Sequence, residues 1–173
     1  MQNYMKLEIM ARSENECFAR SAVAAFALCL APSLSEISDI KTVVSEAVTN
    51  AIVHAYKKTE MGSITILCRA EKDVEKDGAG GVLHIEITDQ GCGIECVEQA
   101  LMPFYTTLAD EERSGMGFSV MQSFCDGFLV ESERGKGTTV RLKKRIGAPF
   151  EMGMDVPCEG ELLGLEREGV NAR

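Results

Sequence analysis

Apolar residues recur at two different spacings along this chain, and the change of spacing separates helices from strands. Between about residues 35 and 56 they recur every three or four positions, which is the spacing of one helix face. A second apolar stretch, 19–30, is also predicted to be helical and to stop near Pro32. Each helix is preceded by a serine with a glutamate three residues later, the pattern of a capping box. The two pairs are Ser13 with Glu16 and Ser33 with Glu36.

Strand-like runs rich in branched residues account for most of the remaining apolar positions. The predicted strands are Met5–Ala11, Ser63–Ala70, Val82–Thr88, Phe128–Ser132 and Thr138–Lys144. Short helices are expected at 95–101 and 117–126, and the polar run 103–115 between them is expected to form an ordered loop or lid. Strands gathered into a hairpin-rich sheet, with helices on one side, predict a two-layer α+β sandwich.

The length of 173 residues favours one domain with a substantial core. We expect residues 1–146 to form that domain. Residues 147–173 hold six acidic and two basic residues without sustained periodicity, so we expect a flexible acidic tail. The polar, glycine-rich segment 71–81 is expected to be a mobile hairpin loop.

Composition narrows the classes of function. The net charge of −9 disfavours direct binding to nucleic acid, and it suits a basic protein partner as well as simple solubility. No apolar run approaches the roughly 20 residues needed to span a bilayer, and no secretory signal is visible, so a cytoplasmic location is expected. Seven cysteines at irregular spacing predict reduced thiols. Cys92 and Cys96 lack a second pair at the spacing of a zinc site.

A carboxylate and a carboxamide, Glu46 and Asn50, stand four residues apart in the longer predicted helix. Residues at this spacing share one helix face. An amide oxygen suits magnesium, which is often held by few protein groups together with phosphate oxygens. A carboxylate one turn away can accept a proton from an attacking hydroxyl. The pair alone is weak evidence, because most such pairs belong to a solvated helix surface.

Two glycine-bearing segments further along the chain strengthen this interpretation. Ser114-Gly115-Met116-Gly117 leads into a predicted helix, whose unpaired N–H groups and dipole favour phosphate. Asp89-Gln90-Gly91-Cys92-Gly93-Ile94 follows a predicted strand. Its carboxylate can accept a hydrogen bond from an exocyclic amine such as that of adenine, and its glycines leave room for a flat ring. Either segment alone could be a simple turn. The chain contains no Walker-type or G-x-G-x-x-G string, so a nucleotide site here would be of another design.

Together, the Glu46–Asn50 motif and the two glycine-bearing segments resemble the ATP-binding boxes shared by gyrase, Hsp90, histidine kinases and MutL. Within that superfamily the chain is similar to the anti-sigma factor serine kinases of spore-forming bacteria, over about residues 5–145. The resemblance implies a homodimer with a Bergerat-type ATP-binding fold, in which helices lie on one face of a mixed, mostly antiparallel sheet. The most similar stretches are Ser13–Arg20, Ile40–Ala51 and Glu112–Phe118.

The resemblance also implies roles for individual residues, with ATP and Mg²⁺ as cofactors. Glu46 would be the catalytic base and Asn50 the magnesium ligand. Asp89 would bind adenine, Thr139 would support the adenine side, and Arg113 would reach the terminal phosphate. The other implied nucleotide contacts are Gly91, Gly93 and Ile94 on the adenine side and Ser114, Gly115, Met116 and Gly117 around the phosphates.

Two protein partners are implied by the same resemblance. One is an RNA polymerase sigma factor that is held inactive, with the sporulation sigma factor F as the first choice and a stress-response sigma factor as the alternative. The other is a small anti-anti-sigma protein that is phosphorylated on a serine. Arg20 matches the sigma-contacting surface, and Thr49 matches a position near the docking site of the antagonist.

Other interpretations stay open at this point. The chain could be a nucleotide-controlled switch that binds sigma with little turnover. The ATP-binding half of a histidine kinase is disfavoured because no phosphoacceptor-histidine helix precedes the boxes. Arg20 could be an ordinary surface charge, Thr49 could serve packing, and Arg113 could pair with Glu111 or Glu112. Leu108 stands where the family commonly has lysine, and the loop at 71–81 is longer than usual.

Overall fold

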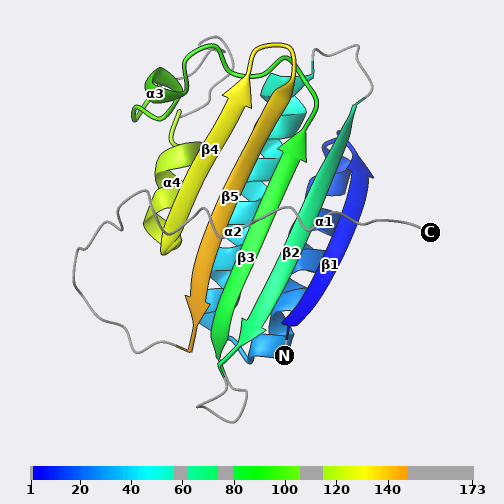
Figure 1. The fold of residues 1–173 in the computed structure, drawn as a ribbon, viewed down its shortest axis with the longest axis vertical. Helices are drawn as coiled ribbons and strands as arrows, with labels where there is room; N and C mark the ends of the chain where they lie inside the picture. Colours follow the sequence, from blue (N-terminus) through cyan, green and yellow to red (C-terminus); the bar gives the residue numbers. More distant parts are fainter. Residues whose placement is uncertain (1, 57–61, 74–79, 106–114, 148–173) are drawn as a thin grey trace.

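The computed structural model describes residues 2–56, 62–73, 80–105 and 115–147. These residues form two layers, a five-stranded sheet with helices against one face, as Figure 1 shows. The order of strands across the sheet is β1-β2-β3-β5-β4, and each neighbouring pair is antiparallel. The predicted two-layer α+β sandwich is therefore confirmed. No helix in the described parts of the chain combines the length and apolar character needed to cross a membrane.

The sheet buries one face and leaves the other partly exposed. Along β2 and β3, buried residues alternate with half-buried ones, because successive side chains of a strand point to opposite faces. Residues 64, 66, 68 and 70 of β2 are fully buried against the helices. The strands are β1 (Gln2–Met10), β2 (Ser63–Lys72), β3 (Gly81–Asp89), β4 (Gly127–Glu133) and β5 (Gly137–Ile146).

The helical layer is formed mainly by two long helices, with shorter turns at their ends. The longer predicted helix divides in two, because α2 stops at Asn50 and a π-helical turn follows it. The predicted short helices are present, somewhat shorter than expected. The elements are α1 (Glu14–Ala27), the 3₁₀ turn η1 (Leu28–Leu30), α2 (Leu34–Asn50), the π-helical turn η2 (Ala51–Ala55), α3 (Val97–Ala100) and α4 (Gly117–Phe124).

One of the two predicted capping boxes forms. The Ser33 hydroxyl accepts the Glu36 N–H at 3.2 Å, and the Glu36 carboxylate accepts the Ser33 N–H at 2.7 Å. The prediction at Ser13 was wrong, since Ser13 has helical backbone angles and its side chain makes no capping bond. Glu16 instead accepts a hydrogen bond from the Ser45 hydroxyl at 2.5 Å, so a contact between α1 and α2 replaces the cap.

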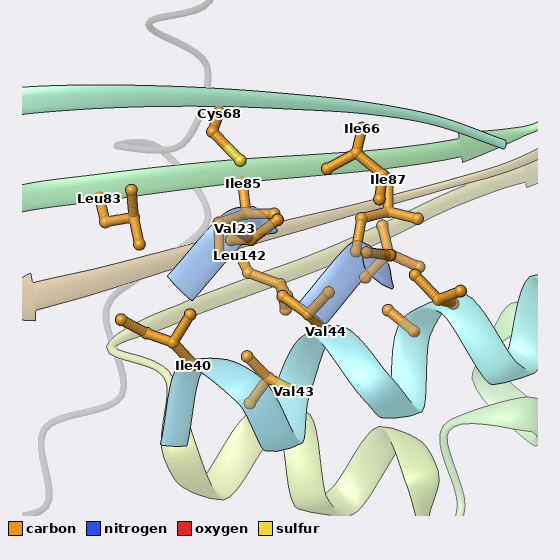
Figure 2. Packing of buried hydrophobic residues seen from close by; sticks show 14 of the residues in the cluster. Val23, Ile40, Val43, Val44, Ile66, Cys68, Leu83, Ile85, Ile87 and Leu142 are labelled. Atoms are coloured by element: carbon orange, nitrogen blue, oxygen red, sulfur yellow. The ribbon is translucent and has the colours of Figure 1, made fainter. Parts of the chain in front are cut away.

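The core lies between α1, α2 and the buried face of the sheet, as seen in Figure 2. One face of α2 supplies five buried residues, and its polar residues near the C-terminal end are only half buried. The helix thus anchors itself with one face and presents Glu46 and Asn50 on another. The five buried residues of α2 are Ile40, Val43, Val44, Ala47 and Val48.

Candidate nucleotide-binding site

The side chains of Glu46 and Asn50 meet the first residue of α4. A Cβ added at Gly117 would lie 2.9 Å from Glu46 Oε2, 3.2 Å from Asn50 Nδ2 and 3.4 Å from Asn50 Oδ1. Both side chains are half buried. The structure therefore brings the predicted base and metal ligand together at the start of a helix, where a larger residue than glycine would crowd them.

The start of α4 suits an anion. Met116 is the N-cap of this eight-residue helix and makes no side-chain capping bond, so its side chain leaves the first N–H groups of α4 available to an anion. Gly115 has a φ of +63°. Its carbonyl accepts the Phe104 N–H at 3.1 Å, so residues near the two ends of the predicted lid, 103–115, are hydrogen-bonded to each other. The predicted phosphate contacts Arg113 and Ser114, and Leu108 of the lid, lie outside the described residues.

Asp89 ends β3 as a buried carboxylate, with 5% of its surface exposed. Its Oδ1 accepts the Gly91 N–H at 2.9 Å and the Thr138 N–H at 3.2 Å. Burial raises the pKa of Asp89 above its ordinary value, and the two N–H donors lower it only in part. Because both bonds fall on one oxygen, the described residues leave Oδ2 as an acceptor for a ligand amine.

The glycines after Asp89 let three backbone segments approach closely. A Cβ on Gly91 would lie 2.2 Å from the Ala55 carbonyl oxygen, and one on Gly93, whose φ is +68°, would lie 2.2 Å from the Glu133 carbonyl oxygen. Cys92 donates its N–H to Ala55 at 2.8 Å. The expectation that these glycines make room for a flat ring is therefore amended, since they make room for the backbone of η2 and of the β4–β5 turn.

Beside Asp89 stands Thr138, a residue that sequence reasoning missed. Its backbone N–H holds the Asp89 carboxylate, and its hydroxyl lies 2.9 Å from that of Ser132. Thr139, which was predicted to support the adenine side, lies 3.1 Å from the Thr88 hydroxyl on the opposite face of the sheet. Alternation along β5 explains the correction, because the buried Val140 shares its face with Thr138.

Ile94 is the last residue of the glycine-bearing segment 89–94, which follows β3. Its N–H donates to the Ser132 hydroxyl at 2.7 Å, and its side chain packs partly buried against the core. Ser132 therefore links the loop after β3 to β5 through Ile94 and Thr138. No simple motif marks Ser132, although its position opposite Thr138 in the β4–β5 pair could have been read from the register.

The two predicted partner-contact residues lie on the helix pair α1 and α2. Arg20 donates to the Glu16 carboxylate at 3.2 Å, and that carboxylate also accepts the Ser45 hydroxyl. Thr49 is half buried next to Asn50. The described contacts tie Arg20 to the α1–α2 interface and give it no bond to Asp89 or Asn50.

Magnesium is the metal that the donor set fits. Among the described residues, no group of three or more histidine, cysteine, aspartate or glutamate side chains could hold a metal by itself. Magnesium is often held by few protein groups and takes its remaining ligands from phosphate and water, so one amide oxygen next to a helix start suited to an anion fits it. Asn50 is the residue that would supply it.

Comparison with known proteins shows the family to which this chain belongs. The histidine kinase-like ATPase domain family matches residues 10–144. The anti-sigma F factor of Clostridium botulinum (strain Eklund 17B / Type B) is 53% identical over 145 residues, which cover 84% of this chain and 96% of that protein. This chain belongs to the anti-sigma F factor family.

A second relative supports the family, and one solved structure shows its fold. The anti-sigma F factor of Geobacillus kaustophilus (strain HTA426) is 50% identical over 146 residues, covering 84% of this chain and 94% of the relative. The crystal structure of the RsbU and RsbW domains of Rv1364c from Mycobacterium tuberculosis superposes with a TM-score of 0.58 at 17% identity. It covers 90% of this chain and 36% of that one, and it shows the shared fold. The anti-sigma F family member thus has the Bergerat-type fold of a histidine kinase-like ATPase domain.

Proposed function

We propose that this protein phosphorylates a serine of an anti-anti-sigma protein with ATP and Mg²⁺, and that it also binds and inhibits an RNA polymerase sigma factor. The observation that carries the kinase activity is the meeting of Glu46 and Asn50 at Gly117. The name of the relatives supports sigma binding. That name, anti-sigma F factor, makes the sporulation sigma factor F the first choice, with a stress-response sigma factor as the alternative.

Each residue of the site has a separate task in this proposal. When bound, Mg-ATP supplies the phosphoryl group and the neutralising charge of the metal. Asp89 accepts a hydrogen bond from the adenine amine through Oδ2, and Asn50 holds the metal. Glu46 accepts the proton of the serine hydroxyl as that oxygen attacks. The N–H groups at the start of α4 bind phosphate oxygens, which is sufficient because phosphoryl transfer depends mainly on positioning and charge.

Replacing the base separates catalysis from binding. Glu46→Gln keeps the size of the side chain but removes the proton acceptor, so serine phosphorylation should fall by about 10²- to 10⁴-fold while ATP affinity stays near wild type. Transfer of labelled phosphate to the antagonist and calorimetric ATP titration measure the two quantities. Glu8→Gln, an exposed change on β1, is the matched control.

The possible results discriminate between the functions. Unchanged phosphorylation in Glu46→Gln would remove the kinase mechanism. A wild-type protein whose affinity for the sigma factor depends on ATP, without any labelled serine, would favour a nucleotide-controlled binding switch. We also propose a homodimer, which sedimentation equilibrium tests directly, and capture of sigma factors from sporulating cells would identify the bound subunit.

A further inference from the structure

The side chain of Tyr56 joins three segments around the candidate site. Tyr56 is the residue at which η2 ends and the chain becomes extended. Its hydroxyl donates to the carbonyl of Ser63, at the start of β2, at 2.7 Å. The same hydroxyl accepts the N–H of Gln90, the residue after Asp89, at 2.9 Å. One phenol thus connects the end of η2 with the start of one strand and the end of another.

The ring of Tyr56 packs in a defined position against Gly62. A Cβ added at Gly62 would lie only 2.0 Å from Cε1 of the tyrosine and 2.1 Å from Cζ. The ring therefore lies directly over the Gly62 backbone, at the position where a side chain would stand. Because the ring is held there and η2 fixes its Cα, the hydroxyl has little freedom to move away from Gln90.

Three consecutive N–H groups after Asp89 show what the hydroxyl does. The Gln90 N–H goes to Tyr56, the Gly91 N–H to Asp89 Oδ1, and the Cys92 N–H to the Ala55 carbonyl. The end of η2 therefore holds the loop on both sides of Gly91, whose N–H is one of the two donors to the Asp89 carboxylate. π-helical turns are rare and are frequently found at functional sites. Here the last residue of the turn, Ala55, and the residue that caps it, Tyr56, supply the two holding groups.

We propose that Tyr56 is a positioning residue for adenine recognition, whose hydroxyl holds the loop so that the Asp89 carboxylate faces the exocyclic amine. This inference rests on the proposed function, because it needs a nucleotide at Asp89. The role acts through Asp89 alone, so it affects the contact with the amine and leaves the phosphate side, at Asn50 and α4, unchanged.

The test uses a ligand that lacks the amine. Tyr56→Phe keeps the ring over Gly62 and removes only the hydroxyl. ATP affinity should fall about tenfold, the size of one lost hydrogen bond, while the affinity for inosine triphosphate, whose base has no exocyclic amine, should change little. The affinity ratio of ATP to inosine triphosphate therefore falls about tenfold, and kcat at saturating ATP stays the same. Tyr4→Phe, at an exposed position of β1, should alter neither affinity.

A second variant tests the position of the Tyr56 ring by changing Gly62, the residue that it packs against. Gly62→Ala keeps the hydroxyl but places a methyl group where the ring lies, so it should displace Tyr56 and lower the same ratio. Urea unfolding of each variant shows whether the fold is retained at the assay temperature. The two variants together separate displacement of the hydroxyl from its removal.

Failure of the proposed function and failure of the Tyr56 inference give different results. If the wild type binds neither nucleotide, the proposed function falls and this inference falls with it. If the wild type prefers ATP but Tyr56→Phe loses both nucleotides equally, or neither, the tyrosine is only structural and this inference alone is overturned. A lower kcat with an unchanged affinity ratio also overturns it.

Discussion

At the scale of single residues, the site depends on how one carboxylate is held. Asp89 is buried, and two backbone N–H groups share its Oδ1, so the fold fixes the direction of the other oxygen. The sequence predicted Asp89 from its place at the end of a strand before a glycine pair. It did not predict the donor Thr138, because a backbone N–H leaves no mark in the sequence and its contact with Asp89 depends on how the start of β5 lies beside the end of β3.

Asp89→Asn should separate folding from nucleotide binding. The amide can still accept the N–H groups of Gly91 and Thr138, and it carries no buried charge, so the fold should be retained and the unfolding free energy at neutral pH should not fall. Its NH₂ group would then face the adenine amine, donor against donor, and ATP affinity should fall about 10- to 100-fold. Calorimetry and urea unfolding measure the two effects, and wild-type ATP affinity in this variant would contradict the adenine role.

The pH dependence of binding follows from the same residue. Burial raises the pKa of Asp89 above its ordinary value of 3.8, so in the folded state the carboxyl takes up a proton at a higher pH than in the unfolded chain. Keeping it ionised costs stability at neutral pH, and this cost disappears as the pH falls through the folded-state pKa. The ionised acceptor for adenine is lost over the same interval.

ATP affinity should therefore decrease on acidification before the pH reaches the ordinary value of an aspartate, while the contribution of Asp89 itself to stability improves. Calorimetric titrations at several pH values between about 7 and about 4 measure this dependence. Asp89→Asn should not show it. An affinity that stays constant down to 3.8 would show that protonation of Asp89 does not control binding.

At the scale of elements, the contact between α2 and α4 brings the proposed catalytic pair, Glu46 and Asn50, to the start of α4. Helical spacing placed Glu46 and Asn50 on one face, and the glycine segment marked the start of α4. Their meeting at Gly117 depends on tertiary packing that no local pattern encodes. The π-helical turn was missed for a similar reason, since apolar residues continue past Asn50 at ordinary helical spacing and the contact with the loop after β3 is distant in sequence.

Gly117→Ala tests this contact. The new methyl group would lie 2.9 Å from Glu46 Oε2, so the carboxylate must move, although alanine itself favours a helix. Serine phosphorylation should fall by about 10²-fold, as expected when a catalytic group is displaced by about 1 Å, with little loss of stability. Gln122→Ala, an exposed alanine substitution in the same helix, is the control. Full activity in Gly117→Ala would show that the crowding is absorbed elsewhere.

At the scale of the whole molecule, stability comes from one buried face of the sheet and the helices on it. This level was the most predictable, because period-two alternation and helical periodicity both report which side of an element is apolar. Local capping was less predictable. The capping box of Ser33 and Glu36 forms at an exposed helix start. At the other helix start, Glu16 accepts a hydrogen bond from Ser45 of the neighbouring helix, and Ser13 makes no capping bond.

Adjacent residues of β2 allow the two faces to be compared. Ile66 is fully buried against the helices, and Ile66→Ala should lower the unfolding free energy by about 2–5 kcal/mol through lost burial and the cavity left behind. Leu67, the next residue, points to the half-buried face, so Leu67→Ala should cost clearly less. Urea unfolding of both variants measures the difference, and equal losses would mean that the second face is as well covered as the first.

The end of β5 has a practical consequence for handling the protein. Gly147 donates its N–H to the carboxylate of Glu36 at 2.8 Å, which fixes this point to the first turn of α2. Asn50 ends the same helix, and 17 residues at about 1.5 Å each put its two ends about 25 Å apart. A fluorophore or surface tether attached at position 147 would therefore lie well away from Asn50 and the candidate nucleotide site, and immobilised protein should still bind nucleotide.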